Sequence, residues 1–153
     1  MSAHPHPILP LMLCLFLLGG CTSFSQPRIS VGEASIVEVS DVAARMDIPV
    51  EITNPNTESI ELREFQYSVV MGGQTVFRGR RATAATLSGG FVRPVVLPAI
   101  IPIDYAKRAK AGEGVSWTVS GELLYLTEGE LAEILLDTGV RSPRASFAHS
   151  GGL

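Results

Sequence analysis

The side chains that carry most enzyme and metal chemistry are sparse in this 153-residue sequence. Downstream of Cys21 there is one histidine, His149, which lies near the C-terminus in a segment rich in Ser and Gly. A catalytic triad or a zinc site needs several such side chains fixed close together, so a lone histidine indicates a surface residue. We therefore expect no catalytic site, no metal site and no cofactor.

The acidic residues and the paired glycines also lack a catalytic arrangement. The acidic groups at 58–64 and 128–133 lie in turn or amphipathic contexts, where contact with solvent explains them. Gly72-Gly73 and Gly89-Gly90 lack the spacing of phosphate-binding loops and fit turns instead. The formal net charge is −3, so there is no basic excess of the kind that nucleic-acid binding needs. Enzymes and nucleic-acid-binding proteins are thus the disfavoured classes.

Cys21 is the residue whose spacing does suggest a reaction. The preceding residues 8–18 are almost wholly apolar, a length that suits an export signal and falls short of the roughly 20 residues of a spanning helix. Leu18-Gly19-Gly20-Cys21 resembles a bacterial lipobox, which implies cleavage between Gly20 and Cys21 and acyl chains on the new N-terminal cysteine. We expect a signal peptide at 1–20 and a membrane anchor at Cys21.

An alternative remains open for this segment, because residues 1–7 contain no Lys or Arg. Export signals normally carry such charges, so an uncleaved N-terminal anchor with Cys21 as an ordinary thiol is the second interpretation. Cys14 lies inside the apolar run, and its removal would leave Cys21 without a disulfide partner. The residue that follows Cys21 is Thr22. A residue other than Asp at this position resembles the sorting pattern for the outer membrane. We expect the cell envelope, at the periplasmic face of the outer membrane if the host has two membranes.

Most of the chain after residue 27 alternates apolar and polar side chains, as half-buried antiparallel strands do. The clearest run covers 44–52, and Pro49 falls on its polar side. Because proline gives no backbone N–H, we expect this strand at a sheet edge or bulged near Pro49. The run ends at Asn54-Pro55-Asn56, where proline stops the ladder and the asparagines favour local side-chain hydrogen bonds. A turn is predicted there.

The remaining patterns predict further short strands and one or two helices. The alternation changes phase at Arg63-Glu64, which predicts a β-bulge, and Gly72-Gly73 predicts a two-residue hairpin turn. Pro94 indicates that its strand is not central. Residues 127–139 fit a capped helix, with a strand as the alternative. The other expected elements are strands at 28–40, 60–71, 74–80, 91–97, 115–126 and 146–148, a connection at 83–90, a helix at 103–110 and a loose end at 150–153.

This order of elements indicates an all-β, antiparallel sandwich, since no βαβ alternation is present. With its Asn54-Pro55-Asn56 corner, glycine turn and Gly121-Glu122-Leu123 strand, it resembles the late-embryogenesis-abundant group 2 family, also called the water stress and hypersensitive response (WHy) domain. The resemblance implies a fibronectin-type β-sandwich of about seven strands over 28–149, after a lipidated tether at 21–27. It also implies a non-enzymatic role in desiccation or water stress.

Three functional hypotheses follow. The first is a membrane-anchored protein that protects stress-unfolded client proteins or membrane surfaces, with no nucleic-acid or metal partner. The second is a carrier for lipid or another apolar ligand, and the third is a passive envelope scaffold that docks through the edge strand marked by Pro49. The second hypothesis depends on an exposed rim of apolar residues interrupted by prolines. The alternative interpretation is that these residues pack in the core. The rim consists of Val95, Val96, Leu97, Ile100, Ile101 and Ile103.

Overall fold

The computed structural model describes residues 24–127 and 143–153, and within them the predicted antiparallel β-sandwich is confirmed. This part of the chain has eight strands and one helix, against about seven strands expected. The elements are β1 (Arg28–Val31), β2 (Ser35–Val39), β3 (Ala43–Thr53), β4 (Ile60–Met71), β5 (Gln74–Leu87), β6 (Val92–Pro102), α1 (Ile103–Lys110), β7 (Ser116–Thr127) and β8 (Arg144–Gly152).

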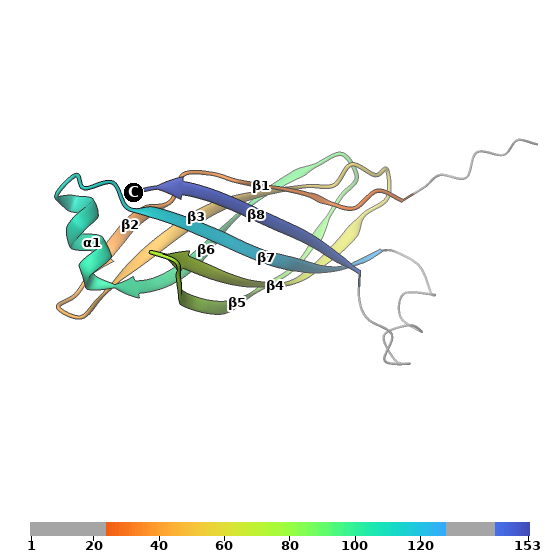
Figure 1. Cartoon of the computed structure of the whole chain (residues 1–153). Coiled ribbons are helices and arrows are strands. Elements are labelled where there is room, and N and C mark those ends of the chain that lie inside the picture. The colour runs from red at the N-terminus through yellow and green to blue at the C-terminus, as the bar shows by residue number, and fades with distance from the viewer. Residues whose placement is uncertain (1–23, 128–142) are drawn as a thin grey trace, which may run out of the picture.

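The strands form two antiparallel sheets that pack face to face (Figure 1). In the first sheet, β1 and then β2 run along one side of β3, and β6 runs along its other side. The second sheet has the order β5-β4-β7-β8. All strands run along the long axis, so the molecule has two distinct ends. We call the end that carries α1 the helix end, and the end where β3 turns into β4 the corner end.

The core lies between the sheets and follows the alternation of the sequence. Every second residue of β3 from Ala44 to Ile52 is buried, and the intervening side chains face outward. On β4 the buried phase changes between Leu62 and Phe65, and both ladders of β4 shift register between Leu62 and Glu64. The predicted bulge is thus confirmed. It returns the apolar residues of the second half of β4 to the core face.

Of the two expectations for Pro49, the edge position is wrong, because β3 has partners on both sides, and no register shift interrupts the β3–β6 ladder at Pro49. The Pro49 carbonyl accepts a hydrogen bond from the Gly32 N–H (2.8 Å), on the side where β1 gives way to β2. The N–H and C=O of one strand residue point the same way, so the missing N–H of Pro49 also faces this break. No ladder bond to β6 is therefore lost. Pro94 does lie on a strand with a single ladder partner, as β6 pairs with β3.

The turns and the helix match the predicted positions. Gly72 and Gly73 close the β4–β5 hairpin with φ values of 57° and 77°, a conformation that glycine adopts without strain. The helix covers Ile103–Lys110, with Pro102 at its N-cap position. The return strand β5 is longer than expected, since it continues to Leu87 through the predicted connection at 83–90.

Both ends of the described chain are more ordered than the sequence indicated. The ring of Phe24 stacks on that of Tyr125, with centroids 6.0 Å apart, and Pro27 is buried, so most of the expected tether packs on the domain. The predicted loose end is also wrong, because β8 continues to Gly152 and Leu153 exchanges backbone hydrogen bonds with Val115. His149 therefore lies in a strand, its ring 5.7 Å from that of Trp117.

Several predictions concern residues outside the described part. They are the signal peptide at 1–20, the cleavage and lipidation site at Gly20 and Cys21, and the helix or strand at 127–139 beyond the end of β7. Within the described residues, no helix is both long and apolar enough to cross a membrane.

Tyr67 links the two sheets and generates a prediction about alkaline stability. Its ring is buried, and its hydroxyl donates to the Pro98 carbonyl on β6. Burial raises the pKa of Tyr67 to about 12, with a lowering effect from Arg81 and a raising effect from Asp47. The unfolded tyrosine ionises near its ordinary pKa of 10.0. Between these two values the unfolded state loses its proton first, so rising pH favours unfolding.

We expect the free energy of unfolding to fall between pH 10 and about 12, by up to about 1.4 kcal/mol per pH unit for this residue. Tyr67→Phe should lose roughly 1 kcal/mol at neutral pH, from the missing hydrogen bond, and show a shallower alkaline slope. Urea unfolding at stepped pH measures both quantities. An identical slope in the variant would assign the alkaline loss to other groups, such as Tyr125, whose pKa burial also raises.

Candidate functional site

The Asn54-Pro55-Asn56 corner is held by a completely bonded asparagine side chain. Asn54 is fully buried, and its Nδ2 donates to the carbonyls of Glu58 (2.8 Å) and Leu87 (3.1 Å). Its Oδ1 accepts from both the backbone N–H and the Nδ2 of Asn56, at 3.1 and 2.9 Å. Both side-chain donors and both oxygen lone pairs are therefore used. Asn54 has no bonding capacity left for a ligand, so its role is structural.

The corner also joins two other segments of the chain. The Asn54 backbone N–H donates to the Phe91 carbonyl (3.0 Å), and its carbonyl accepts from the Gly90 N–H (2.9 Å). The amide of Asn56 makes a two-bond pair with the backbone of Ser25, at 2.8 Å in each direction. A Cβ on Gly89 would lie 2.2 Å from the Thr57 carbonyl oxygen, so only glycine allows this approach. The loop before β6, the corner and the N-terminal segment thus form one unit.

Asn54→Asp is expected to destabilise the domain by about 3 kcal/mol. The substitution keeps the shape but removes both Nδ2 donors, and it places a carboxylate against two carbonyl oxygens. Asn56→Ala, at a half-buried residue whose partners can bond to water, should cost about 1 kcal/mol. Urea denaturation of the two variants beside the unchanged protein measures the difference. Equal, small losses in both variants would contradict the structural role of Asn54.

The six residues of the predicted apolar rim do not form one surface. They lie on β6 and at the start of α1, where the strand alternation separates them. Leu97 and Ile101 are buried in the core between the sheets, whereas Val96 and Ile100 are 44% and 50% exposed on the outer face. Val95 is half-buried, and Ile103 belongs to a different cavity described next. The side chains of both sheets fill the space that an acyl chain between them would need.

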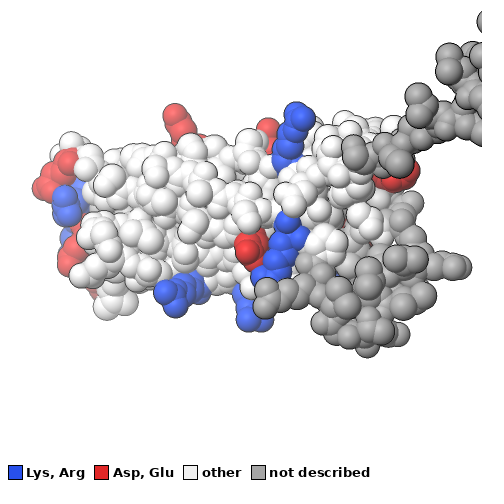
Figure 2. Space-filling model, turned by 45° about the vertical axis from the view of Figure 1, so that its right-hand side comes forward, with Lys and Arg blue, Asp and Glu red and all other residues white. Residues whose placement is uncertain are grey.

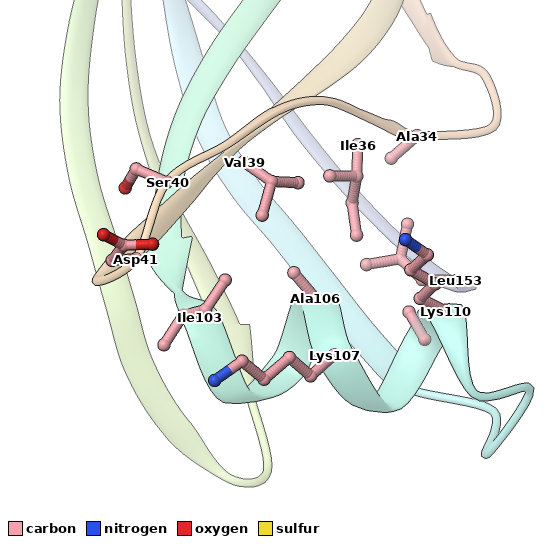
Figure 3. Close-up of a pocket in the computed structure, with 11 residues that line it drawn as sticks. Ala34, Ile36, Val39, Ser40, Asp41, Ile103, Ala106, Lys107, Lys110 and Leu153 are labelled. Carbon is pink, nitrogen blue, oxygen red and sulfur yellow. The ribbon is translucent and has the colours of Figure 1, made fainter.

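A pocket of about 700 Å³ lies at the helix end, between β2 and α1 (Figure 3). Small and branched apolar side chains from both elements point into it, with Ala106 on the helix facing Ile36 and Val39 on the strand. Its size is in the range of about 300–1,000 Å³ that small-molecule sites occupy. The lining residues are Ala34, Ile36, Val39, Ser40, Asp41, Ile103, Ala106, Lys107, Ala109, Lys110 and Leu153.

Helical periodicity gives α1 the face that lines this pocket. Residues 103, 106, 107 and 110 are three or four apart, so they share one side of the helix. The helix is fixed from its other faces, because the Tyr105 hydroxyl donates to the Met71 carbonyl (3.1 Å) and Arg108 pairs with Glu113 (3.0 Å). These contacts hold the wall of the pocket in place. The two alanines of that wall leave the space that larger side chains would fill.

The charges at the pocket lie on its rim. Lys107 and Lys110 are exposed and contribute their stems to the lining, and Asp41 is the one acidic side chain that lines it. The sequence indicated Ile36, Val39 and the helix separately, but it gave no sign that they meet. The only related feature in the sequence of this helix is the pair of small residues Ala106 and Ala109, which does not identify the facing strand. The pocket can hold an apolar group and present cationic groups at its mouth.

No metal centre emerges from the parts of the chain that the structure describes. Among residues 24–127 and 143–153, no group of three or more His, Cys, Asp or Glu side chains could hold a metal ion. On the face shown in Figure 2, the Lys and Arg side chains are dispersed among uncharged ones instead of forming a single continuous patch. This face therefore lacks the basic stripe of a nucleic-acid interface.

Comparison with known proteins gives relatives that share both fold and sequence. No protein-family model matches the chain. A protein assigned as desiccation-related, LEA14 of Arabidopsis thaliana, is 21% identical over 108 residues, which cover 71% of this chain and 72% of the relative.

Solved structures show the same sandwich. A protein of Arabidopsis thaliana solved in solution matches with a TM-score of 0.62 and 15% identity, over 90% of this chain and 87% of the other. A protein assigned to the late-embryogenesis-abundant class matches with a TM-score of 0.57 and 13% identity, over 84% of this chain and 70% of the other. A crystal structure of a protein from Archaeoglobus fulgidus matches with a TM-score of 0.54 and 14% identity, over 81% of this chain and 94% of the other. The chain is thus related in sequence to a desiccation-related LEA14 protein, and it shares the fold of late-embryogenesis-abundant proteins.

Proposed function

We propose that this chain is a non-enzymatic stress protein, anchored to a membrane through acyl chains on Cys21, that protects proteins or membrane surfaces during water loss. The relationship to a desiccation-related protein over 71% of the chain is the observation that carries the proposal. The proposed place is the cell envelope, at the periplasmic face of the outer membrane if the host has two membranes. Cys21, Gly20 and the signal peptide support it through their sequence pattern.

The geometry of the corner end supports the anchoring. Asn56 holds Ser25, which follows Cys21 by four residues, and four extended residues span at most about 14 Å. Acyl chains on Cys21 would therefore keep the corner end close to the bilayer. Phe24, Phe91 and Val92 are exposed there. Apolar side chains beside a lipid anchor add contact with the membrane surface.

Protection by a folded domain has to work through contact, since a sandwich cannot coat its clients as a disordered chain does. Apolar side chains exposed at the helix end offer such contact away from the membrane. They are Val37, Val39 and Val42, on β2 and in the turn that follows it. The scaffold alternative loses its sequence support, because Pro49 does not mark an edge strand. The pocket beside α1 favours a second candidate function, that of a carrier for an apolar ligand.

Lipidation can be tested by substituting each cysteine separately in a bacterial host. The unchanged chain and Cys14→Ser should both incorporate a labelled fatty acid and begin at residue 21 after processing. Cys21→Ser should do neither, because the acyl acceptor is lost. Mass spectrometry of the purified chains measures both features. An unlabelled chain that still begins at residue 1 would establish the uncleaved anchor instead.

Protection can be tested by drying a dehydration-sensitive enzyme with residues 22–153 of this chain. We expect severalfold more residual activity than with an equal mass of an inert folded protein, because direct contact would shield partly unfolded enzyme. A parallel sample of dried phospholipid vesicles, assayed for leakage, distinguishes protection of membranes from protection of proteins. No advantage over the inert protein in either assay would rule out direct shielding.

A further inference from the structure

We propose that the pocket between β2 and α1 binds a long-chain fatty acid, with the aliphatic chain along the groove and the carboxylate at Lys110 on the rim. The inference is independent of the proposed stress function, since it depends only on the shape and charge of the pocket. Anchoring of Cys21 at the corner end does not enter it either.

The apolar interior of the pocket comes from elements that are distant in sequence. Ile36 and Val39 of β2 form one wall, Ile103 and Ala106 of α1 form the opposite wall, and Leu153 closes one end (Figure 3). The pocket is a single groove between one strand and one helix. That shape suits one unbranched chain, which gains from burial of each methylene.

The rim selects for an anion. Lys107 and Lys110 lie one turn apart on the pocket side of α1, and their ammonium groups point to opposite ends of the groove, that of Lys107 toward Ile103 and that of Lys110 toward Leu153 (Figure 3). Asp41 lies near the Ile103 end of the groove, and Lys110 lies at the Leu153 end (Figure 3). Arg108 is not among the lining residues and is paired with Glu113 (3.0 Å). Lys110 is therefore the lining cation at the end of the groove away from Asp41, and it is the group that would receive a carboxylate head group.

The site is at the opposite end of the molecule from the residues beside Cys21. A ligand that merely partitions into the bilayer would contact the corner end, around Phe24 and Phe91. A ligand of the pocket would contact β2 and α1 instead. The position of a covalent label therefore separates binding in the pocket from general contact with lipid.

The test uses the intact chain in phospholipid nanodiscs and a fatty acid that carries a photoreactive diazirine near the end of its chain. After irradiation, mass spectrometry should place the label on peptides from β2 and α1. Val39→Trp and Ala109→Phe fill the groove from opposite walls and should each lower this labelling at least fivefold. Val42→Trp and Ala111→Phe are matched controls outside the lining and should leave it within twofold. Unchanged melting temperatures show that the variants are folded.

A second set of variants tests whether binding requires the negative charge of the ligand. The double variant Lys107→Gln, Lys110→Gln should lower labelling by the acid about tenfold and leave labelling by the corresponding fatty alcohol unchanged, whereas Arg108→Gln should alter neither. Labelling confined to the corner end, or unaffected by both groove-filling variants, would overturn the proposal. Equal labelling by acid and alcohol would overturn the anionic ligand, and labelling only by a diazirine phospholipid would overturn the single-chain ligand.

Discussion

The buried side chain of Asn54 is the constraint on which the arrangement of the sandwich depends. A buried amide is costly unless each of its donors and acceptors is bonded, and Asn54 meets this condition with Asn56, Glu58 and Leu87. Its partners belong to the turn before β4 and to the end of β5, so one side chain sets where β3 leaves the first sheet and β4 enters the second. The backbone of the same residue binds the loop before β6. Any slip of β3 or β4 would leave this amide unbonded, which makes one register much more stable than its neighbours.

Much of the fold could be predicted because its signals are local. Alternation on β3, the phase change at Arg63 and the glycine pair at 72–73 each act within a few residues, and the structure confirms all three. The edge position predicted from Pro49 is wrong because the effect of a proline depends on the partner strand. The break between β1 and β2 lies opposite Pro49, so no backbone N–H is needed there. The C-terminal residues 150–152 look loose by composition, yet they pair with the start of β7. Pairing between distant segments leaves no mark in the composition of either segment.

The difference between local signals and contacts of distant segments also explains which parts of the candidate site could be predicted. The apolar run of β6 predicts one rim, but a strand sends neighbouring side chains to opposite faces, so Leu97 is buried and Val96 is exposed. The pocket was missed for a different reason. Its walls come from β2, from α1 and from Leu153, and its volume comes from the small size of Ala106 and Ala109. An absence of bulk at a helix face is visible in the sequence only once the facing strand is known.

The two ends of the sandwich are separated by the length of its strands. The 11 residues of β3 span about 35 Å, from the turn beside the pocket to the corner that holds Ser25. Anchoring at Cys21, as proposed, would hold the corner end near the bilayer, and the pocket lies at the other end of the domain. In that arrangement, the fatty acid proposed for the pocket would reach it from the aqueous phase or from a partner protein. An anionic single-chain molecule is soluble enough to do so, whereas a two-chain phospholipid is not, and the lysines at the mouth of the pocket fit that difference.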